Sequence, residues 1–224
     1  MSYHYEDPCP EVALHDITPI ITRAHSWLAR AANDLPHEEN IQFGGAIFML
    51  SGMDYHLAAV QGHLAAASDY ISLSSSRLIR WEASCLQNVS FNERLPEPTA
   101  IEQEHLTQIA HDAVAYINRL GQFYAFAKAK SQNQHLVRAA ELLIFRNKHT
   151  AHRSIDDPRK EDDYMSMWSQ AVSMGGFYSM ISEGGPIFSI PDAQSNWQEF
   201  NILKDHPLLL SECMATLEAI SAVP

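Results

Sequence analysis

Apolar residues recur at the spacing of an α-helix along most of this sequence, and this periodicity constrains the fold more than any other feature. Prolines and polar loops interrupt the pattern and set the ends of the predicted helices. The spacing predicts helices over residues 19–35, 39–68, 77–88, 98–130 and 133–153, and a final helix from Asp205 onward. We expect the serine-rich run 72–76 to break or kink the chain between the second and third of these helices.

The sequence changes character toward its C-terminal end. Two β-prone runs, residues 177–181 and 186–190, flank Ser182-Glu183-Gly184-Gly185, which predicts a β-hairpin around a Gly-Gly turn. The predicted fold class is therefore mainly α, an antiparallel helical bundle with a small C-terminal β-hairpin. The 224 residues are predicted to form a single helical domain over 1–224, with a bundle core over 16–153 and the hairpin and final helix, 154–224, packed on it.

Composition narrows the class of protein. The hydrophobic content of 46% is too high for intrinsic disorder. Three widely separated cysteines, Cys9, Cys85 and Cys213, exclude a disulfide scaffold and suit a reducing compartment. The N-terminal residues lack the pattern of a signal peptide, and no stretch reaches about 20 consecutive apolar residues. We therefore expect a cytoplasmic protein that does not associate with a membrane.

Charge is distributed unevenly along the chain. The formal net charge of −12 argues against a protein coated in basic surface for nucleic acid. Residues 119–160 nevertheless hold nine of the fifteen Lys and Arg residues and carry +6, so the rest of the chain carries −18. A basic segment on an acidic protein is a candidate anion site. The alternative is a chance cluster of charges on a solvated helix.

Most catalytic signatures are absent from the sequence. It contains no phosphate-binding loop, no dinucleotide fingerprint, no HExxH zinc motif and no nucleophile elbow, so no cofactor is expected. Twelve histidines are a high count, and His56 and His63 share one face of the second predicted helix. A metal site in a bundle usually takes three or four ligands, including carboxylates. We expect satisfied or exposed histidines and no metal site.

One segment could carry chemistry, the run Arg146–Arg153 at the end of the predicted helix 133–153. Arginine presents a planar, permanently charged set of donors that fits a phosphate, and histidine can take or give a proton near neutral pH. Two of each around a ribose phosphate suffice for RNA cleavage without a metal. One histidine deprotonates the 2′-hydroxyl, which attacks phosphorus, and arginine stabilises the transition state. The products are a 2′,3′-cyclic phosphate and a 5′-hydroxyl.

The position of these residues around the helix predicts an interface. At 100° per residue, the apolar stripe of residues 133–153 centres near Ala140 and Ala151 and contains Asn147, while Arg146 and His152 flank it on opposite sides. The face turned away from the stripe holds Arg138, Leu142, Phe145, His149 and Arg153. Two apolar side chains among cations predict that this face is covered. Either a second copy of the chain packs there in a two-fold dimer, or the C-terminal hairpin and helix of the same chain cover it.

The run R-N-K-x-x-A-H-R, late in a helical bundle, resembles the HEPN superfamily, and particularly its abortive-infection-type members and related uncharacterised bacterial families. HEPN proteins are all-α and commonly dimeric, and many are metal-independent endoribonucleases of toxin–antitoxin, phage-defence or CRISPR systems. The resemblance implies that Arg146 contacts phosphate, that Asn147 is the polar residue following it, and that His152 is the general base or acid. The toxins that pair with a nucleotidyltransferase antitoxin carry a tyrosine two residues after the histidine, where this chain has Ser154.

The resemblance leads to an expected function with two alternatives. The expected function is a metal-independent endoribonuclease of HEPN type, in stress response or phage defence, acting as a homodimer on RNA with an antitoxin or another protein as a partner. Its candidates for RNA and phosphate binding are Arg138, Lys148, His149 and Arg153. One alternative is a non-catalytic HEPN-like module that binds a nucleotide or a protein. The other is a helical protein with no nucleic-acid role, whose Arg–His run is an internal polar brace.

Overall fold

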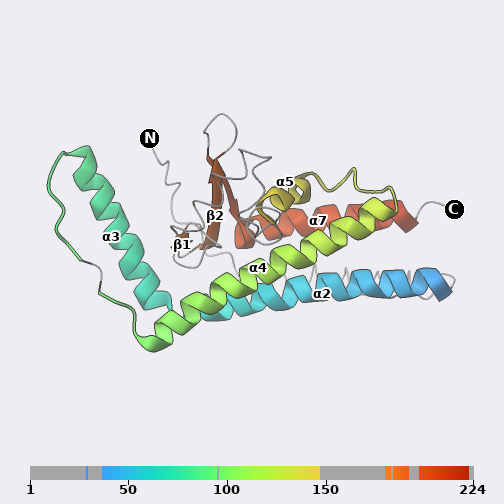
Figure 1. The fold of residues 1–224 in the computed structure, drawn as a ribbon, viewed down its shortest axis with the longest axis horizontal. Helices are drawn as coiled ribbons and strands as arrows, with labels where there is room; N and C mark the ends of the chain where they lie inside the picture. Colours follow the sequence, from blue (N-terminus) through green and yellow to red (C-terminus); the bar gives the residue numbers. More distant parts are fainter. Residues whose placement is uncertain are drawn as a thin grey trace, which may run out of the picture.

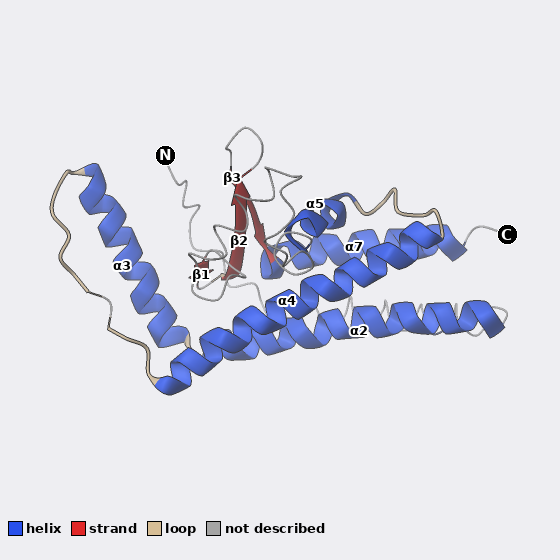
Figure 2. Cartoon of the chain, viewed as in Figure 1, coloured by secondary structure: helices blue, strands red, loops and turns tan. Residues whose placement is uncertain are grey.

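The computed structural model of the protein describes residues 29, 37–94, 96–146, 180–182, 184–191 and 197–221. These residues are mainly helical, with a small antiparallel sheet late in the chain (Figure 2). The helices are α2 (His37–Ala66), α3 (Ser68–Leu86), α4 (Ala100–Ala129), α5 (Val137–Arg146) and α7 (Ile202–Ser221), and the strands are β1 (Met180–Ser182), β2 (Gly185–Pro191) and β3 (Trp197–Asn201). The predicted fold class is confirmed. Of the predicted helix over 19–35, all but Ala29, which is helical, lies outside the described residues.

The centre of the fold is the long antiparallel pair α2 and α4. Its direction follows from contacts between the two helices, because Phe43 packs edge-on against Phe126 while His63 contacts His105. The core between them is apolar and closely packed, with Met53, Leu57, Val60, Ile109, Ala113, Ile117 and Leu120 all buried. Burial of a large apolar side chain contributes roughly 1.5–3 kcal/mol, so this seam is a main source of the stability of the bundle.

The predicted bounds of these two helices are nearly correct. The start of α4 is fixed by a capping box, in which the Thr99 hydroxyl accepts a hydrogen bond from the Glu102 amide and the Glu102 carboxylate accepts one from the Thr99 amide. Pro96 and Pro98 lie in the loop before it, as expected. Two orphan amides of the first turn are thereby satisfied.

The break between α2 and α3 is not where the sequence predicts it. Residues 72–76 are helical within α3, and the chain bends at Ala67, where the backbone leaves helical geometry with φ −103° and ψ 12°. Serine is tolerated at these positions because α3 is largely open to solvent, with Ile71 as its buried residue. The helix projects away from the α2–α4 pair and is joined to α4 by a long loop (Figure 1).

The late hairpin is confirmed, and the structure adds a third strand. β1 and β2 pair antiparallel, with Ser182 opposite Gly185 across the turn, and β3 pairs antiparallel with the other edge of β2. Gly185 has φ +105°, and a Cβ there would lie 2.7 Å from Cδ1 of Leu203. Glycine is therefore required by both backbone conformation and packing, and the hairpin fits closely against the start of α7.

The final helix starts three residues before the predicted position. Asn201, and not Asp205, is the N-terminal cap of α7, because its side-chain oxygen accepts hydrogen bonds from the amides of Leu203 and Lys204. The carboxylate of Asp205 accepts a hydrogen bond from the Asn201 amide. Together these contacts turn the chain from β3 directly into α7.

Candidate functional site

The candidate site begins at the C-terminal end of α5. Arg146 is the last residue of that helix, and its side chain is outside the described part of the structure. The other candidates for catalysis, Asn147 and His152, lie outside the described residues, as do Lys148, His149 and Arg153 among the candidates for RNA binding. Arg138, near the start of α5, is the candidate whose surroundings are described.

The predicted core face of α5 is only partly correct. Leu136, placed toward the core, is buried, but Val137, placed on the same face, is 63% exposed. Leu142, placed on the outer face that we expected to be covered, is fully buried together with Ala139 and belongs to the hydrophobic core of this chain. At Leu142 this face is therefore covered within the single chain, and at Arg138 it meets Asp205 of α7.

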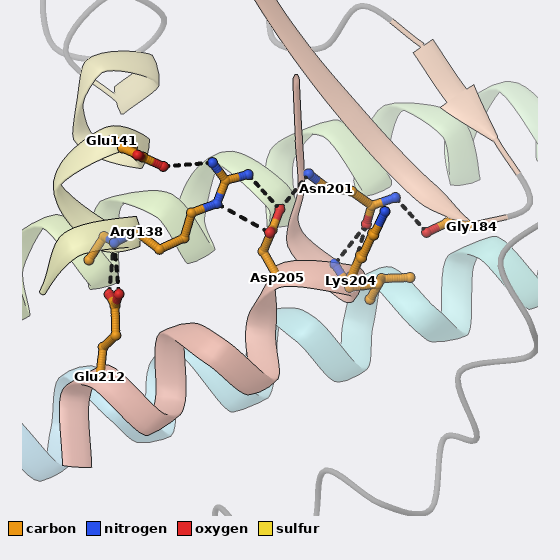
Figure 3. A network of polar contacts seen from close by, with 9 residues as sticks. Arg138, Glu141, Gly184, Asn201, Lys204, Asp205 and Glu212 are labelled. Carbon is orange, nitrogen blue, oxygen red and sulfur yellow. Dashed lines mark hydrogen bonds and ion pairs between the residues drawn. The ribbon is translucent and has the colours of Figure 1, made fainter. Parts of the chain in front are cut away.

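Arg138 lies at the centre of a polar network between α5 and α7 (Figure 3). Its guanidinium donates to Asp205 on α7 through Nε and Nη2, both at 3.2 Å, and to Glu141 through Nη1 at 2.8 Å. The guanidinium carbon also lies 5.2 Å from the centre of the Phe200 ring. Two carboxylates thus neutralise this cation inside one chain, and a phosphate has to compete with both of them.

A second contact of the same pair of helices fixes the start of α5. The Glu212 carboxylate accepts hydrogen bonds from the backbone amides of Arg138 and Ala139, at 2.7 Å and 3.0 Å. These amides belong to the first turn of α5, where no carbonyl of the helix can accept them, and a carboxylate there also compensates the positive end of the helix dipole. α7 therefore holds α5 by its N-terminal end.

The network continues from α7 into the hairpin. Asp205, which pairs with Arg138, also accepts the Asn201 amide, and the Asn201 side-chain amide donates to the Gly184 carbonyl in the turn between β1 and β2 (Figure 3). A chain of contacts thus runs from the hairpin turn through α7 to α5. In the described part of the protein Arg138 acts as a positioning group for α5, and its role in binding RNA stays a prediction.

The structure also assembles a polar cluster that the sequence reasoning missed, on one edge of the α2–α4 seam. Nδ1 of His56 lies 2.8 Å from Oδ1 of Asp112, Nε2 of His63 lies 3.9 Å from Oδ2 of Asp112, and the Nδ1 atoms of His63 and His105 are 2.9 Å apart. The available signal was the seven-residue spacing of 56 with 63 and of 105 with 112, which puts each pair on one helix face. The register between the two helices is what the sequence does not give.

This cluster consists of two hydrogen-bonded pairs, His56–Asp112 and His63–His105, that approach each other to 3.9 Å between His63 and Asp112. The two ring nitrogens of His63 lie on opposite sides of its ring, one toward His105 and the other toward Asp112, so a single ion cannot gather all of the groups. Within the described ranges no group of three or more His, Cys, Asp or Glu side chains is placed to hold a metal. The contact between His63 and His105 requires a proton on one of the two facing nitrogens.

A buried pair of titratable side chains links α4 to α7. The Tyr116 hydroxyl and Nδ1 of His206 are 2.6 Å apart, and both side chains are almost completely buried. Burial lowers the pKa of His206 to about 4 and raises the pKa of Tyr116 well above its usual value. Nε2 of His206 has no hydrogen-bond partner among the described residues. Both groups are therefore uncharged at neutral pH and stabilise α7 as a polar contact within the core.

Comparisons of the chain with protein-family models, with curated proteins and with solved structures gave no match. The resemblance to HEPN proteins therefore rests on the residues Arg146–Arg153 and on the helical fold. None of the helices in the described ranges combines the length and the apolar character needed to cross a membrane.

Proposed function

We propose that this protein is a metal-independent endoribonuclease of HEPN type, with Arg146 as the phosphate ligand and His152 as the general base or acid. Asn147 is the polar residue between them, and Lys148, His149 and Arg153 supply further contacts to RNA. The proposal is supported by the mainly helical fold and by the place of the motif, which starts at the last residue of α5. Its biological setting, stress response or phage defence in the cytoplasm, follows from the resemblance alone.

The observation that carries the proposal is the anchoring of α5. A metal-free nuclease gains its rate from groups held in fixed positions around the phosphate. Glu212 and Arg138 bind the first turn of α5 to α7 at 2.7–3.2 Å, and Leu142 is buried beneath them. The helix that leads into the Arg–His run therefore has a defined direction, which a catalytic arginine at its end requires.

The same observation changes the expected dimer. Two copies cannot meet through the α5 face at Leu142, because this side chain is already buried within the single chain. A dimer that joins the two Arg–His runs has to form beyond Arg146, and it stays part of the proposal together with an antitoxin or other protein partner.

The test is cleavage of a labelled single-stranded RNA by the full chain in EDTA. We expect products ending in a 2′,3′-cyclic phosphate, and a loss of about 100-fold or more in rate for His152→Ala, the usual contribution of a general acid or base. His135→Ala is the matched control, because His135 is an exposed histidine just before α5, and it should retain full activity. Circular dichroism and thermal unfolding establish that both variants are folded.

Two results would overturn the proposal. Equal cleavage by folded His152→Ala excludes this histidine as the catalytic group. RNA binding that depends on Arg146 without any cleavage favours the alternative of a non-catalytic binding module.

A further inference from the structure

The outer face of α2 carries an apolar stripe that is largely exposed in the part of the chain that the structure describes. Ile41, Phe48 and Tyr55 are 65%, 63% and 70% exposed, and they follow one another at intervals of seven residues. Large apolar side chains are seldom left open in a row on a stable surface. Residues at this spacing lie on one face of a helix, so the three side chains form a continuous line along α2.

Small residues lie between the large ones on this line and continue it toward the end of α2. Together they form what we call the outer stripe of α2, composed of Ile41, Gly44, Phe48, Ser51, Tyr55, Ala58, Gly62 and Ala65. Every member except the half-buried Ser51 is exposed, and none is charged. From residue 41 to the end of α2, Asp54 is the only Asp, Glu, Lys or Arg. The stripe spans about 36 Å at 1.5 Å per residue.

Two glycines of the outer stripe have no explanation in the contacts of the described residues. A Cβ built at Gly44 or at Gly62 meets nothing within 4 Å, whereas one at Gly52, on the neighbouring flank, would lie 2.9 Å from Nε of Arg119. Glycine inside a helix is less favourable than alanine by about 1 kcal/mol. Gly44 and Gly62 therefore weaken α2 without easing a contact between described residues, and they leave room for another helix to approach closely.

We propose that the outer stripe of α2 binds the same stripe of a second copy of this chain. The two helices are antiparallel, and the two-fold axis crosses the outer face of α2 at the level of residue 53. In this alignment the stripe is complementary to itself. Phe48 faces Ala58 of the partner subunit, and Ile41 faces Ala65 of the partner subunit. Tyr55 faces Ser51 of the partner subunit, and Gly44 faces Gly62 of the partner subunit. Each large side chain meets a small residue, as knobs-into-holes packing requires.

A parallel alignment lacks this complementarity. It sets Phe48 against the partner's Phe48 and Tyr55 against the partner's Tyr55, which crowds two levels of the interface. An unrelated helix would have no reason to match the order of large and small residues on α2, whereas the reversed copy of α2 sets each of the three large residues opposite a small one.

The proposed interface is independent of the proposed nuclease. α4 lies between α2 on one side and α5 and α7 on the other (Figure 1), so two copies joined through α2 keep their α5 helices on distant sides. The interface uses no residue of α5, so its dissociation by substitutions in the outer stripe separates it from the dimer proposed for the nuclease, which joins the Arg–His runs.

The first test is the mass of the full chain in solution by sedimentation or light scattering. We expect a dimer of twice 25.2 kDa, and a dissociation constant raised about 100-fold or more by Phe48→Glu, which buries a charge in the interface. Because Phe48 also contacts Arg119, Ala58→Glu is a second variant at an exposed position without that contact. Leu86→Glu on α3 is the matched control, since Leu86 is 87% exposed but off the stripe, and it should leave the mass unchanged.

The second test fixes the direction of the helices. In a chain with Cys9→Ser and Cys85→Ser, the double variant Gly44→Cys/Gly62→Cys should form a disulfide-linked dimer under oxidation, because the antiparallel alignment brings these positions within disulfide range. Each single variant should stay unlinked, since its two copies are then about 27 Å apart along the axis.

Three results would overturn the inference. They are a wild-type monomer at all concentrations measured, a dimer that Phe48→Glu and Ala58→Glu leave intact in folded protein, and cross-linking by either single cysteine variant, which indicates a parallel pair.

Discussion

The helices α5 and α2 differ in how their outer faces are used. On α5, Leu142 and Arg138 lie on a face that the sequence predicted to be covered, either by a second copy or by the C-terminal part of the same chain. Leu142 is buried within the single chain, and Arg138 pairs with Asp205 of α7. On α2, Phe48 and Tyr55 lie on a face that stays largely exposed among the described residues. An apolar side chain on the outside of a helix therefore predicts a cover, but not whether the cover comes from the same chain.

The largest expected difference between the two helices is in the effect of truncating an apolar side chain. Leu142→Ala removes a fully buried side chain and should lower the free energy of unfolding by about 3 kcal/mol. Phe48→Ala should lower it by less than about 1 kcal/mol at protein concentrations too low for association, since Phe48 is mostly exposed. Urea unfolding of both variants measures the contrast. Equal losses would mean that the outer stripe of α2 is packed within one chain.

Acid should lower the stability of the protein through His206 of α7. The pKa of His206 is lowered to about 4 by burial, whereas an unfolded histidine titrates near 6.5. Between these pH values the unfolded chain binds more protons than the folded chain. The stabilisation by neutral His206 is therefore fully present above pH 6.5, and the free energy of unfolding falls by about 3 kcal/mol as the pH is lowered toward 4.

The variant His206→Gln should flatten this pH dependence in urea titrations. His135→Gln, an exposed histidine near α5, is the matched control and should keep it. A pH dependence that survives in His206→Gln would assign the acid sensitivity to other groups.

The smallest expected effect concerns the first turn of α5. Glu212→Ala removes the acceptor for the amides of Arg138 and Ala139 and should lower stability by about 1 kcal/mol, the usual size of a capping contact. Hydrogen exchange should be faster in α5 and unchanged at the outer stripe of α2. Glu104→Ala, an exposed glutamate on α4, controls for the loss of charge. Uniformly faster exchange would show that α5 is not a separate unit.

Sequence patterns predicted the elements of this fold better than their contacts. The bounds of α2 and α4 and the β1–β2 hairpin follow from periodicity and turn residues, which act over short range. β3 was missed because a strand of five residues that leads directly into a helix gives little alternation. The core face of α5 was predicted correctly at Leu136 but not at Val137, because the side that α5 buries depends on its packing against α4 and α7.

The candidate site shows the same limit. Arg146 was correctly placed at a helix, but the carboxylates that surround Arg138 come from one neighbour on α5 and one residue of α7, and helix geometry alone identifies only the first. The cluster of His56, Asp112 and His105 likewise depends on how α2 and α4 are aligned. Spacing within one helix can be read from the sequence, whereas the register between helices depends on packing.

The helix α4 links the two halves of the described fold. This helix contacts α2, α5, α7 and β2, so both the helical and the strand parts of the fold pack against it. Asp112 faces the histidines of α2, and Tyr116, one turn later, faces His206 of α7. A rotation of α4 about its own axis would disturb both contacts at once. A change at the His56–Asp112 contact would therefore reach the Tyr116–His206 contact through α4.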